Sequence, residues 1–291
     1  MALDSPSSND SLLHQILPNE MECLISRPSS LIFLSFYITI TLLILPICIF
    51  VLYLGLQRWR QRSSTSSTTS HSDIFTFHMV LIELVDYSGF TLYLYGLYTV
   101  HVIIYRVGYF VVCFTWYGRN SFHVLTCVER YLAVVHPVTY MNLKGERGVR
   151  IRNICIGCVW LIFIAVTPLN IEKPLFYFDL SLTIIALGIV FFCSMSVLCV
   201  LIRPGPGEQG GDRKIVDQSK RRAFFTIMAI LAIMLVNCCA NLMWFVSAVS
   251  GETICEMAVA DNWLSLPSSL VLPLLFLHRA GTLTCCKKIT K

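Results

Sequence analysis

Four ionisable side chains lie inside two mostly apolar stretches, where an unpaired charge is costly. Glu83 and Asp86 stand three residues apart in one stretch, and Arg119 and His123 stand four residues apart in the next one. Spacings of three and four residues place side chains on one face of a helix. Because charged groups within a bilayer face the protein interior and pair there, these residues predict a buried polar core.

Two arrangements of this core remain open. In the first, the Arg119 guanidinium bridges Asp86 and Glu83, and so stands where a bound cation would otherwise neutralise the acids. In the second, Arg119 faces a water-filled outer cavity and binds an acidic ligand directly. His123 is interpreted as a hydrogen-bonded polar neighbour, and a proton-sensing role is the alternative because imidazole titrates near neutral pH.

The composition of the chain indicates that lipid surrounds this core. Of 291 residues, 56% are hydrophobic and only 13% are charged, and the mean hydropathy is +0.70. A soluble domain carries about 25% charged residues, whereas a helix bundle in lipid needs no charged shell. The alternative is an unusually apolar soluble enzyme, which this composition disfavours.

Seven apolar stretches are long enough to cross a bilayer, which takes about 20 residues as a helix. They are predicted between Arg27 and Arg58, at 74–97, 102–128, 153–171 and 180–202, between Arg222 and Glu252, and between Asp261 and Arg279. Residues 203–222 are hydrophilic and begin with a Pro-Gly-Pro-Gly string after Arg203, so they are predicted to form a loop.

The charges of the connecting segments predict the orientation of these spans. Most of the 22 basic residues fall in connections on one side, and most acidic residues outside the spans fall on the other side. Because cytoplasmic loops are enriched in Lys and Arg, the N-terminus is expected outside and the tail in the cytosol. The net charge of +5 is therefore a sign of membrane topology, and no nucleic-acid partner is expected.

The inner end of the third predicted span reads Glu129-Arg130-Tyr131, followed by Leu-Ala-Val-Val-His and Pro137. This segment resembles the Asp/Glu-Arg-Tyr motif of rhodopsin-like (class A) G-protein-coupled receptors. The resemblance implies that Glu129 holds Arg130 at rest and that Arg130 meets the end of a G-protein α subunit when the helices part. The alternative is an arginine that only anchors the helix end in the headgroup region.

Other matches to this family are partial. Trp160 and Pro168 resemble the usual Trp and Pro of the fourth span, and the segment with Pro273 and Phe276 resembles the Asn-Pro-x-x-Tyr region, with Phe276 in place of the Tyr. The usual Pro of the fifth span, the Cys-Trp-x-Pro of the sixth and the Cys at the outer end of the third are absent. A receptor that signals weakly or together with a partner therefore stays open.

By resemblance Asp86 takes the place of the Asp that binds a sodium ion in this family. If Arg119 bridges the acids instead of the ion, sodium is expected to have no effect on ligand affinity.

Covalent modifications are predicted at both ends of the chain. Asn9 begins an Asn-Asp-Ser glycosylation triplet on the expected outer side. Cys285 and Cys286 precede two lysines after the last span, which suits palmitoylation at the inner leaflet. Cys23 and Cys255 are the cysteines expected outside, and they form either a disulfide or two free thiols.

We therefore expect an all-α, seven-transmembrane bundle with an extracellular segment at 1–30, a receptor domain at 31–280 and a cytoplasmic tail at 281–291. Its expected function is that of a plasma-membrane receptor that relays a small-molecule or lipid ligand to a heterotrimeric G protein. The alternative is a transporter or channel in which Glu83, Asp86 and Arg119 line the path. No enzymatic constellation, metal site or cofactor is expected from the sequence.

Overall fold

The protein is described by a computed structural model that covers residues 29–62, 71–143, 145–172, 176–202, 212–250 and 255–279. Within these ranges the chain is all-helical and contains no strand. The elements are α2 (Ser29–Thr39), the π-helical η1 (Ile40–Ile44), α3 (Leu45–Arg62), α4 (His71–Tyr98), α5 (Val102–Val135), α6 (Pro137–Asn142), α7 (Glu146–Glu172), α8 (Phe176–Ile202), α9 (Asp212–Ser250) and α10 (Cys255–Arg279).

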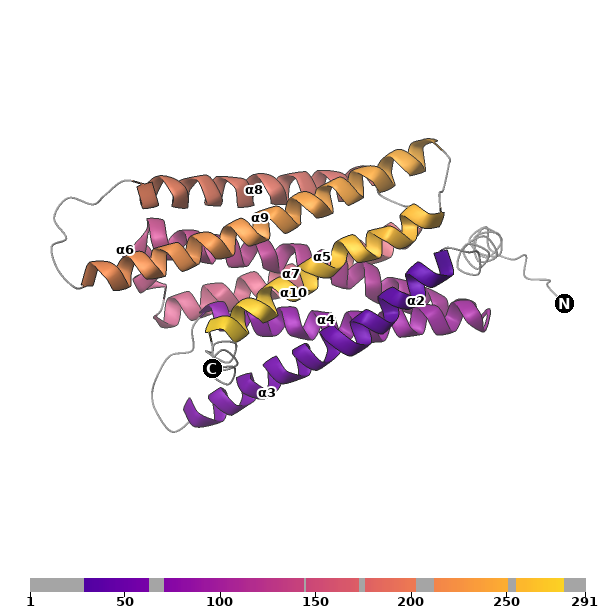
Figure 1. Cartoon of the computed structure of the whole chain (residues 1–291), viewed down its shortest axis with the longest axis horizontal. Helices are drawn as coiled ribbons and strands as arrows, with labels where there is room; N and C mark the ends of the chain where they lie inside the picture. Colours follow the sequence, from indigo (N-terminus) through magenta and orange to yellow (C-terminus); the bar gives the residue numbers. More distant parts are fainter. Residues whose placement is uncertain are drawn as a thin grey trace, which may run out of the picture.

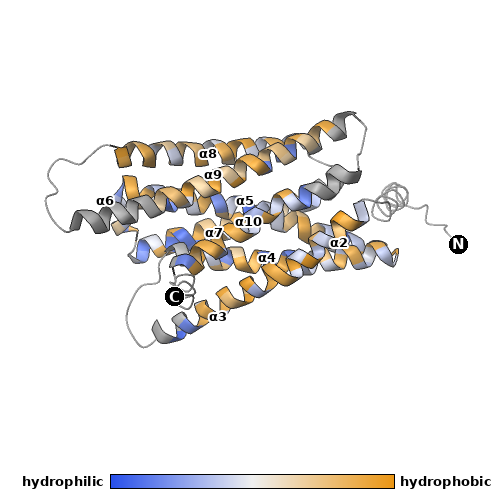
Figure 2. Ribbon diagram, in the orientation of Figure 1, coloured by the Kyte–Doolittle hydropathy of each residue, from blue (hydrophilic) through white to orange (hydrophobic). Residues whose placement is uncertain are grey.

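Four helical segments of the described chain are long and apolar enough to cross a membrane, which suits a membrane-embedded protein. They are Ser29–Gln57, Glu146–Pro168, Tyr177–Ile202 and Ala223–Met243. Many of their large apolar side chains are exposed on the surface of the helices. The hydropathy colours show how predominantly apolar α8 is (Figure 2). An apolar surface of this extent requires a partner other than water, and lipid is the simplest one.

Most helices follow the apolar stretches of the sequence, but three begin well before the predicted start: α7 at Glu146, α9 at Asp212 and α10 at Cys255. The predicted loop at 203–222 is wrong from Asp212 onward, because α9 begins at that residue. No Gly or Pro follows Gly211 in this segment, its Lys, Arg and Gln residues favour helix, and Asp212 stands where a negative charge stabilises a helix N-terminus. A polar segment next to a long apolar helix can therefore continue that helix.

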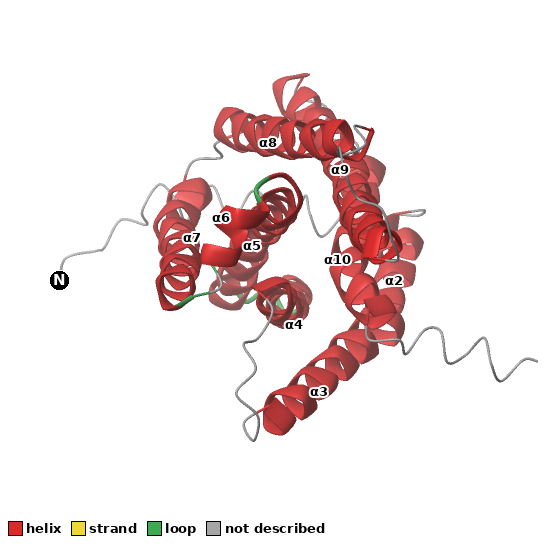
Figure 3. Cartoon of the chain, turned by 90° about the vertical axis from the view of Figure 1, so that its left-hand side faces the viewer, coloured by secondary structure: helices red, strands yellow, loops and turns green. Residues whose placement is uncertain are grey.

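The central element of the fold is α5, which contacts α4, α7, α8 and α9. Seen end-on, α5 lies inside the arc formed by the other long helices (Figure 3). The long helices run side by side, and α6 lies at the same end as the N-terminal ends of α7 and α9 (Figure 1). We call this end the inner end, and the end with the α4–α5 turn the outer end.

The hairpin of α4 and α5 is unusually close. A methyl group built on Gly96 would overlap the backbone of Tyr105, and one built on Gly108 would overlap the backbone of Tyr93. The turn between the helices closes with hydrogen bonds from His101 to Gly96 (2.9 Å) and from Val100 to Leu97 (3.3 Å), and Val100 takes a φ of 56°. These are the contacts of a Schellman motif. The close backbones bring side chains of α4 and α5 within direct reach of each other.

Candidate functional site

The predicted polar core forms an ion-paired cluster between α4 and α5. Arg119 Nε donates to Glu83 Oε1 at 2.8 Å, and Arg119 Nη2 donates to Asp86 Oδ2 at 2.9 Å. A longer contact of 3.4 Å joins Nη2 to Glu83 Oε2. The guanidinium thus bridges both acids, which is the first of the two arrangements that the sequence left open.

The three side chains of this cluster differ in their exposure. Glu83 and Arg119 expose only 3% and 7% of their side chains, whereas Asp86 exposes 25%. Asp86 also accepts a hydrogen bond from the Thr115 hydroxyl through its other oxygen, Oδ1. Burial of charges is tolerated when they are paired and hydrogen-bonded in this way. Asp86 is the member of the cluster that remains open to a further ligand.

His123 lies one helical turn inward from Arg119, as the sequence predicted, but it belongs to a different contact. Its ring is fully buried, and Nε2 is 2.8 Å from the Ser268 hydroxyl on α10. The other ring nitrogen, Nδ1, has no hydrogen-bond partner within the described residues. The histidine therefore connects α5 to α10.

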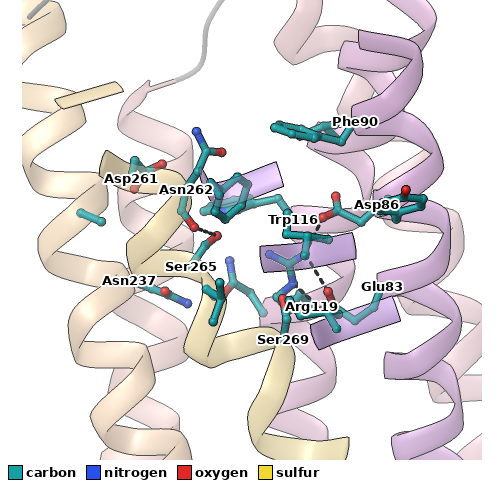
Figure 4. Close-up of a pocket in the computed structure, with 18 of the residues that line it drawn as sticks. Glu83, Asp86, Phe90, Trp116, Arg119, Asn237, Asp261, Asn262, Ser265 and Ser269 are labelled. Atoms are coloured by element: carbon teal, nitrogen blue, oxygen red, sulfur yellow. Dashed lines mark hydrogen bonds and ion pairs between the residues drawn. The ribbon is translucent and has the colours of Figure 1, made fainter. Parts of the chain in front are cut away.

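A cavity of about 130 Å³ borders the ion-paired cluster (Figure 4). Its walls come from α2, η1, α4, α5, α9 and α10. Besides the cluster, its polar lining consists of Tyr87, Asn120, Asn237, Asn241, Asp261, Asn262, Ser265 and Ser269, and its apolar lining consists of Phe36, Ile40, Ile44, Phe90, Val112, Trp116, Ala240 and Leu266. Polar groups that converge on one apolar-walled cavity are typical of a ligand site.

Two asparagines in this cavity were missed by sequence reasoning. Asn120 and Asn237 are 5% and 8% exposed, and no hydrogen bond engages either side chain anywhere in the part of the chain that the structure covers. Buried polar side chains normally find partners, so these two amides are available to a molecule in the cavity. A polar residue within an apolar stretch is a signal for such positions, and Asn237 in α9 carried that signal.

Glu129 and Arg130 lie near the C-terminal end of α5, at the inner end of the bundle. Glu129 is buried and Arg130 is half-buried. Glu129 Oε1 accepts a hydrogen bond from the Tyr140 hydroxyl of α6 at 3.1 Å. This contact borders a mostly apolar cavity of about 110 Å³, which also includes Arg152 of α7. The acid of the predicted motif therefore ties α5 to the short helix that follows it.

Tyr131 and Pro137 organise the turn between α5 and α6. The Tyr131 hydroxyl and His136 Nε2 are 3.1 Å apart, and the Tyr131 ring also packs on Phe192 of α8 at 5.8 Å. Pro137 is the first residue of α6, a position that suits proline because its missing N–H has no intrahelical partner. This turn places α6 at the inner end of the bundle, where Val138 and Met141 are exposed.

The residues compared with helix landmarks occupy ordinary packing positions. Trp160 packs on Phe114 at 5.3 Å and on Phe122 at 6.0 Å. Pro168 lies within α7 and Pro273 lies within α10. Phe276 is 2% exposed, and its ring packs against Phe77 of α4. These contacts hold neighbouring helices together and do not distinguish a receptor from another helical membrane protein.

Several predicted modification sites lie outside the described residues: Asn9, Cys23, Cys285 and Cys286. Cys255 is the first residue of α10, so a bridge from it to Cys23 remains a prediction. Comparison with known proteins gives no further guide, because no protein-family model matches this chain and no curated protein is significantly similar to it.

Proposed function

We propose that this protein is a divergent rhodopsin-like receptor of the plasma membrane, in which seven spans couple an outer ligand site to a G protein at the inner end. The spans are α2 to α3, α4, α5, α7, α8, α9 and α10. The N-terminus is outside, and the C-terminus is cytoplasmic. The sequence supports this orientation, since most of the basic residues fall in connections that alternate onto one side of the predicted spans.

The spans that are less apolar in this scheme are α4, α5 and α10, and burial supports their placement in the bilayer. Glu83, Arg119 and His123 are all less than 9% exposed, and so are Ser268 and Ser269 of α10. Polar side chains that point into the bundle do not meet lipid. The charge on these helices is thus compatible with a membrane span even though it lowers their hydropathy.

The observation that carries the proposal is the inner end of α5. Glu129-Arg130-Tyr131 stands at this end with its acid buried and its arginine half-buried. Beside it, α6 exposes the apolar side chains of Val138 (74%) and Met141 (69%). Exposed apolar residues next to a cationic group are typical of a protein-docking surface. In this proposal the docking partner is the α subunit of a heterotrimeric G protein.

The test uses the full chain in cells that carry a panel of Gα activation reporters. The Arg130→Ala variant is expected to abolish basal or evoked signal at unchanged surface expression, because the cation at the docking surface is lost. The matched control is Arg150→Ala, which removes an exposed arginine from α7 at the same end and is expected to keep the signal. Signal that survives Arg130→Ala would contradict the proposed role of the motif.

Transport is the second candidate function, and the cavity beside Glu83, Asp86 and Arg119 is the observation that favours it. Solute flux through a transporter would depend on Glu83 and Arg119 and would not depend on Arg130. Flux of labelled solutes into proteoliposomes, measured for Glu83→Gln and Arg130→Ala, separates the two functions. Flux lost in the first variant and kept in the second would replace the receptor proposal.

The proposal extends to three covalent features of the termini. Asn9 carries an N-glycan, Cys285 and Cys286 carry palmitate, and a disulfide joins Cys23 to Cys255. Glycosidase treatment, acyl exchange and non-reducing mass mapping test them in turn, using the Asn9→Gln and Cys285→Ser/Cys286→Ser variants as controls. Two free thiols at Cys23 and Cys255 would end the disulfide proposal.

A further inference from the structure

The cavity has an unbalanced charge. Three carboxylates line it, from Glu83, Asp86 and Asp261, and its one cationic lining residue within the described chain is Arg119. With all four groups ionised, the cavity has a formal excess of two negative charges. An anionic ligand would add to this excess, and two of the three guanidinium nitrogens of Arg119, Nε and Nη2, already bind the two acids. A cationic ligand would reduce the excess.

Asp86 is placed to receive such a cation. It keeps 25% of its side chain exposed after pairing with Arg119 and Thr115. Figure 4 shows its carboxylate pointing into the cavity, with Phe90 and Trp116 beside it. Aromatic faces attract an organic cation through their quadrupole, most strongly for Trp. A carboxylate flanked by aromatic rings favours an ammonium group carried by an organic body over a bare metal ion.

Asn120 of α5 and Asn237 of α9 supply hydrogen-bonding groups for the body of the ligand. The amides of Asn120 and Asn237 are more than nine-tenths buried and have no partner within the described residues, and Figure 4 shows Asn237 directed toward the cavity. Because one water molecule needs about 10 to 15 Å³ of cavity space, the cavity of about 130 Å³ has room for a ligand of roughly ten non-hydrogen atoms.

We propose that this cavity binds a small protonated amine, with the ammonium group on Asp86, an aromatic or aliphatic body against Phe90 and Trp116, and a polar end on Asn120 and Asn237. Asp261, on α10, supplies a second and weaker attraction at the rim. The inference deepens the proposed receptor function by naming its ligand class. Binding can nevertheless be measured without any G protein, so the two proposals fail separately.

Three matched probes of suitable size test the ligand class on the detergent-solubilised full chain. They are phenethylamine, which is a cation at neutral pH, phenethyl alcohol, which is neutral, and phenylacetate, which is an anion. Thermal unfolding is followed as each probe is titrated, since a ligand that binds the folded state raises the melting temperature by mass action. Phenethylamine is expected to raise it in a saturable way, and the other two probes are not.

Variants locate the site. Asp86→Asn is expected to weaken phenethylamine binding about tenfold to a hundredfold, the usual strength of a hydrogen bond to a charged group. Asp261→Asn leaves the ion-paired cluster intact and is expected to weaken phenethylamine binding a few-fold. It provides the test of the site if Asp86→Asn does not fold. Glu146→Gln removes an exposed carboxylate of α7 outside the cavity and is expected to leave binding unchanged.

Three outcomes would overturn the inference. Stabilisation by phenylacetate in place of phenethylamine would make Arg119 the anchor for an acidic ligand. Full stabilisation by sodium chloride, compared with the choline salt, would make the cavity an inorganic-cation site. Absence of any shift, or an amine shift that both aspartate variants keep, would remove the cavity as an amine site. Gα signalling that Arg130 controls would survive each of these results.

Discussion

Arg119 and Arg130 lie on the same helix, eleven residues apart and on nearly the same face, yet their surroundings differ. Arg119 is 6% exposed and forms ion pairs with two acids of α4. Arg130 is half-buried at the inner end, next to a glutamate whose carboxylate receives a tyrosine hydroxyl from α6. The first arginine is part of the interior, and the second one lies at a surface.

This difference teaches how position along a long helix determines what a charge can do. In the middle of the bundle a guanidinium is neutralised mainly by protein groups, because little of it is exposed to solvent. At the helix end, partial hydration lowers that demand, so the charge can change partners. The same residue type is therefore ion-paired in the interior at one position and partly exposed at the other.

The largest expected effect comes from placing one substitution at both arginines. Arg119→Met leaves two carboxylates without their common cation and is expected to lower the free energy of unfolding by about 3 to 5 kcal/mol. Arg130→Met is expected to lower it by less than about 1 kcal/mol. Thermal unfolding of the purified chains measures both. Equal losses would show that the two arginines do not differ in this way.

A rescue variant sharpens the first result. Combining Arg119→Met with Glu83→Gln and Asp86→Asn removes the excess charge together with its partner, so most of the lost stability is expected to return. If stability instead falls further, the packing of the arginine side chain would matter more than its charge.

The next effect concerns the close hairpin that lets Arg119 reach α4. Gly108→Ala places a methyl group against the backbone of Tyr93 and is expected to lower the free energy of unfolding by about 1 to 3 kcal/mol. Gly157→Ala in α7 meets no atom within 4 Å and is the matched control, with no loss expected. Similar melting temperatures for the two variants would refute the role of the close approach.

The smallest effect belongs to the inner end. Tyr140→Phe removes the hydroxyl that donates to Glu129 and is expected to lower the free energy of unfolding by about 1 kcal/mol. Tyr98→Phe removes a hydroxyl from an exposed tyrosine of α4 and is expected to change nothing measurable. A loss of several kcal/mol in Tyr140→Phe would mean that the inner end is as tightly held as the ion-paired cluster.

The sequence alone determined the helical class, the approximate extent of most helices and the existence of a buried polar core. These features follow from local properties: the length of apolar stretches, the helical period and the cost of a charge within them. The polar start of α9 was predicted incorrectly, because hydropathy marks where lipid contact ends and not where a helix begins.

Only the tertiary structure decided which polar residues meet. Glu83 and Asp86 reach Arg119 because two glycines let α4 and α5 approach closely. Asn120, Asn237 and Asp261 face one cavity because α5, α9 and α10 pack around it. Such meetings depend on the relative positions of helices far apart in the sequence, and spacing along a single helix carries no information about those positions.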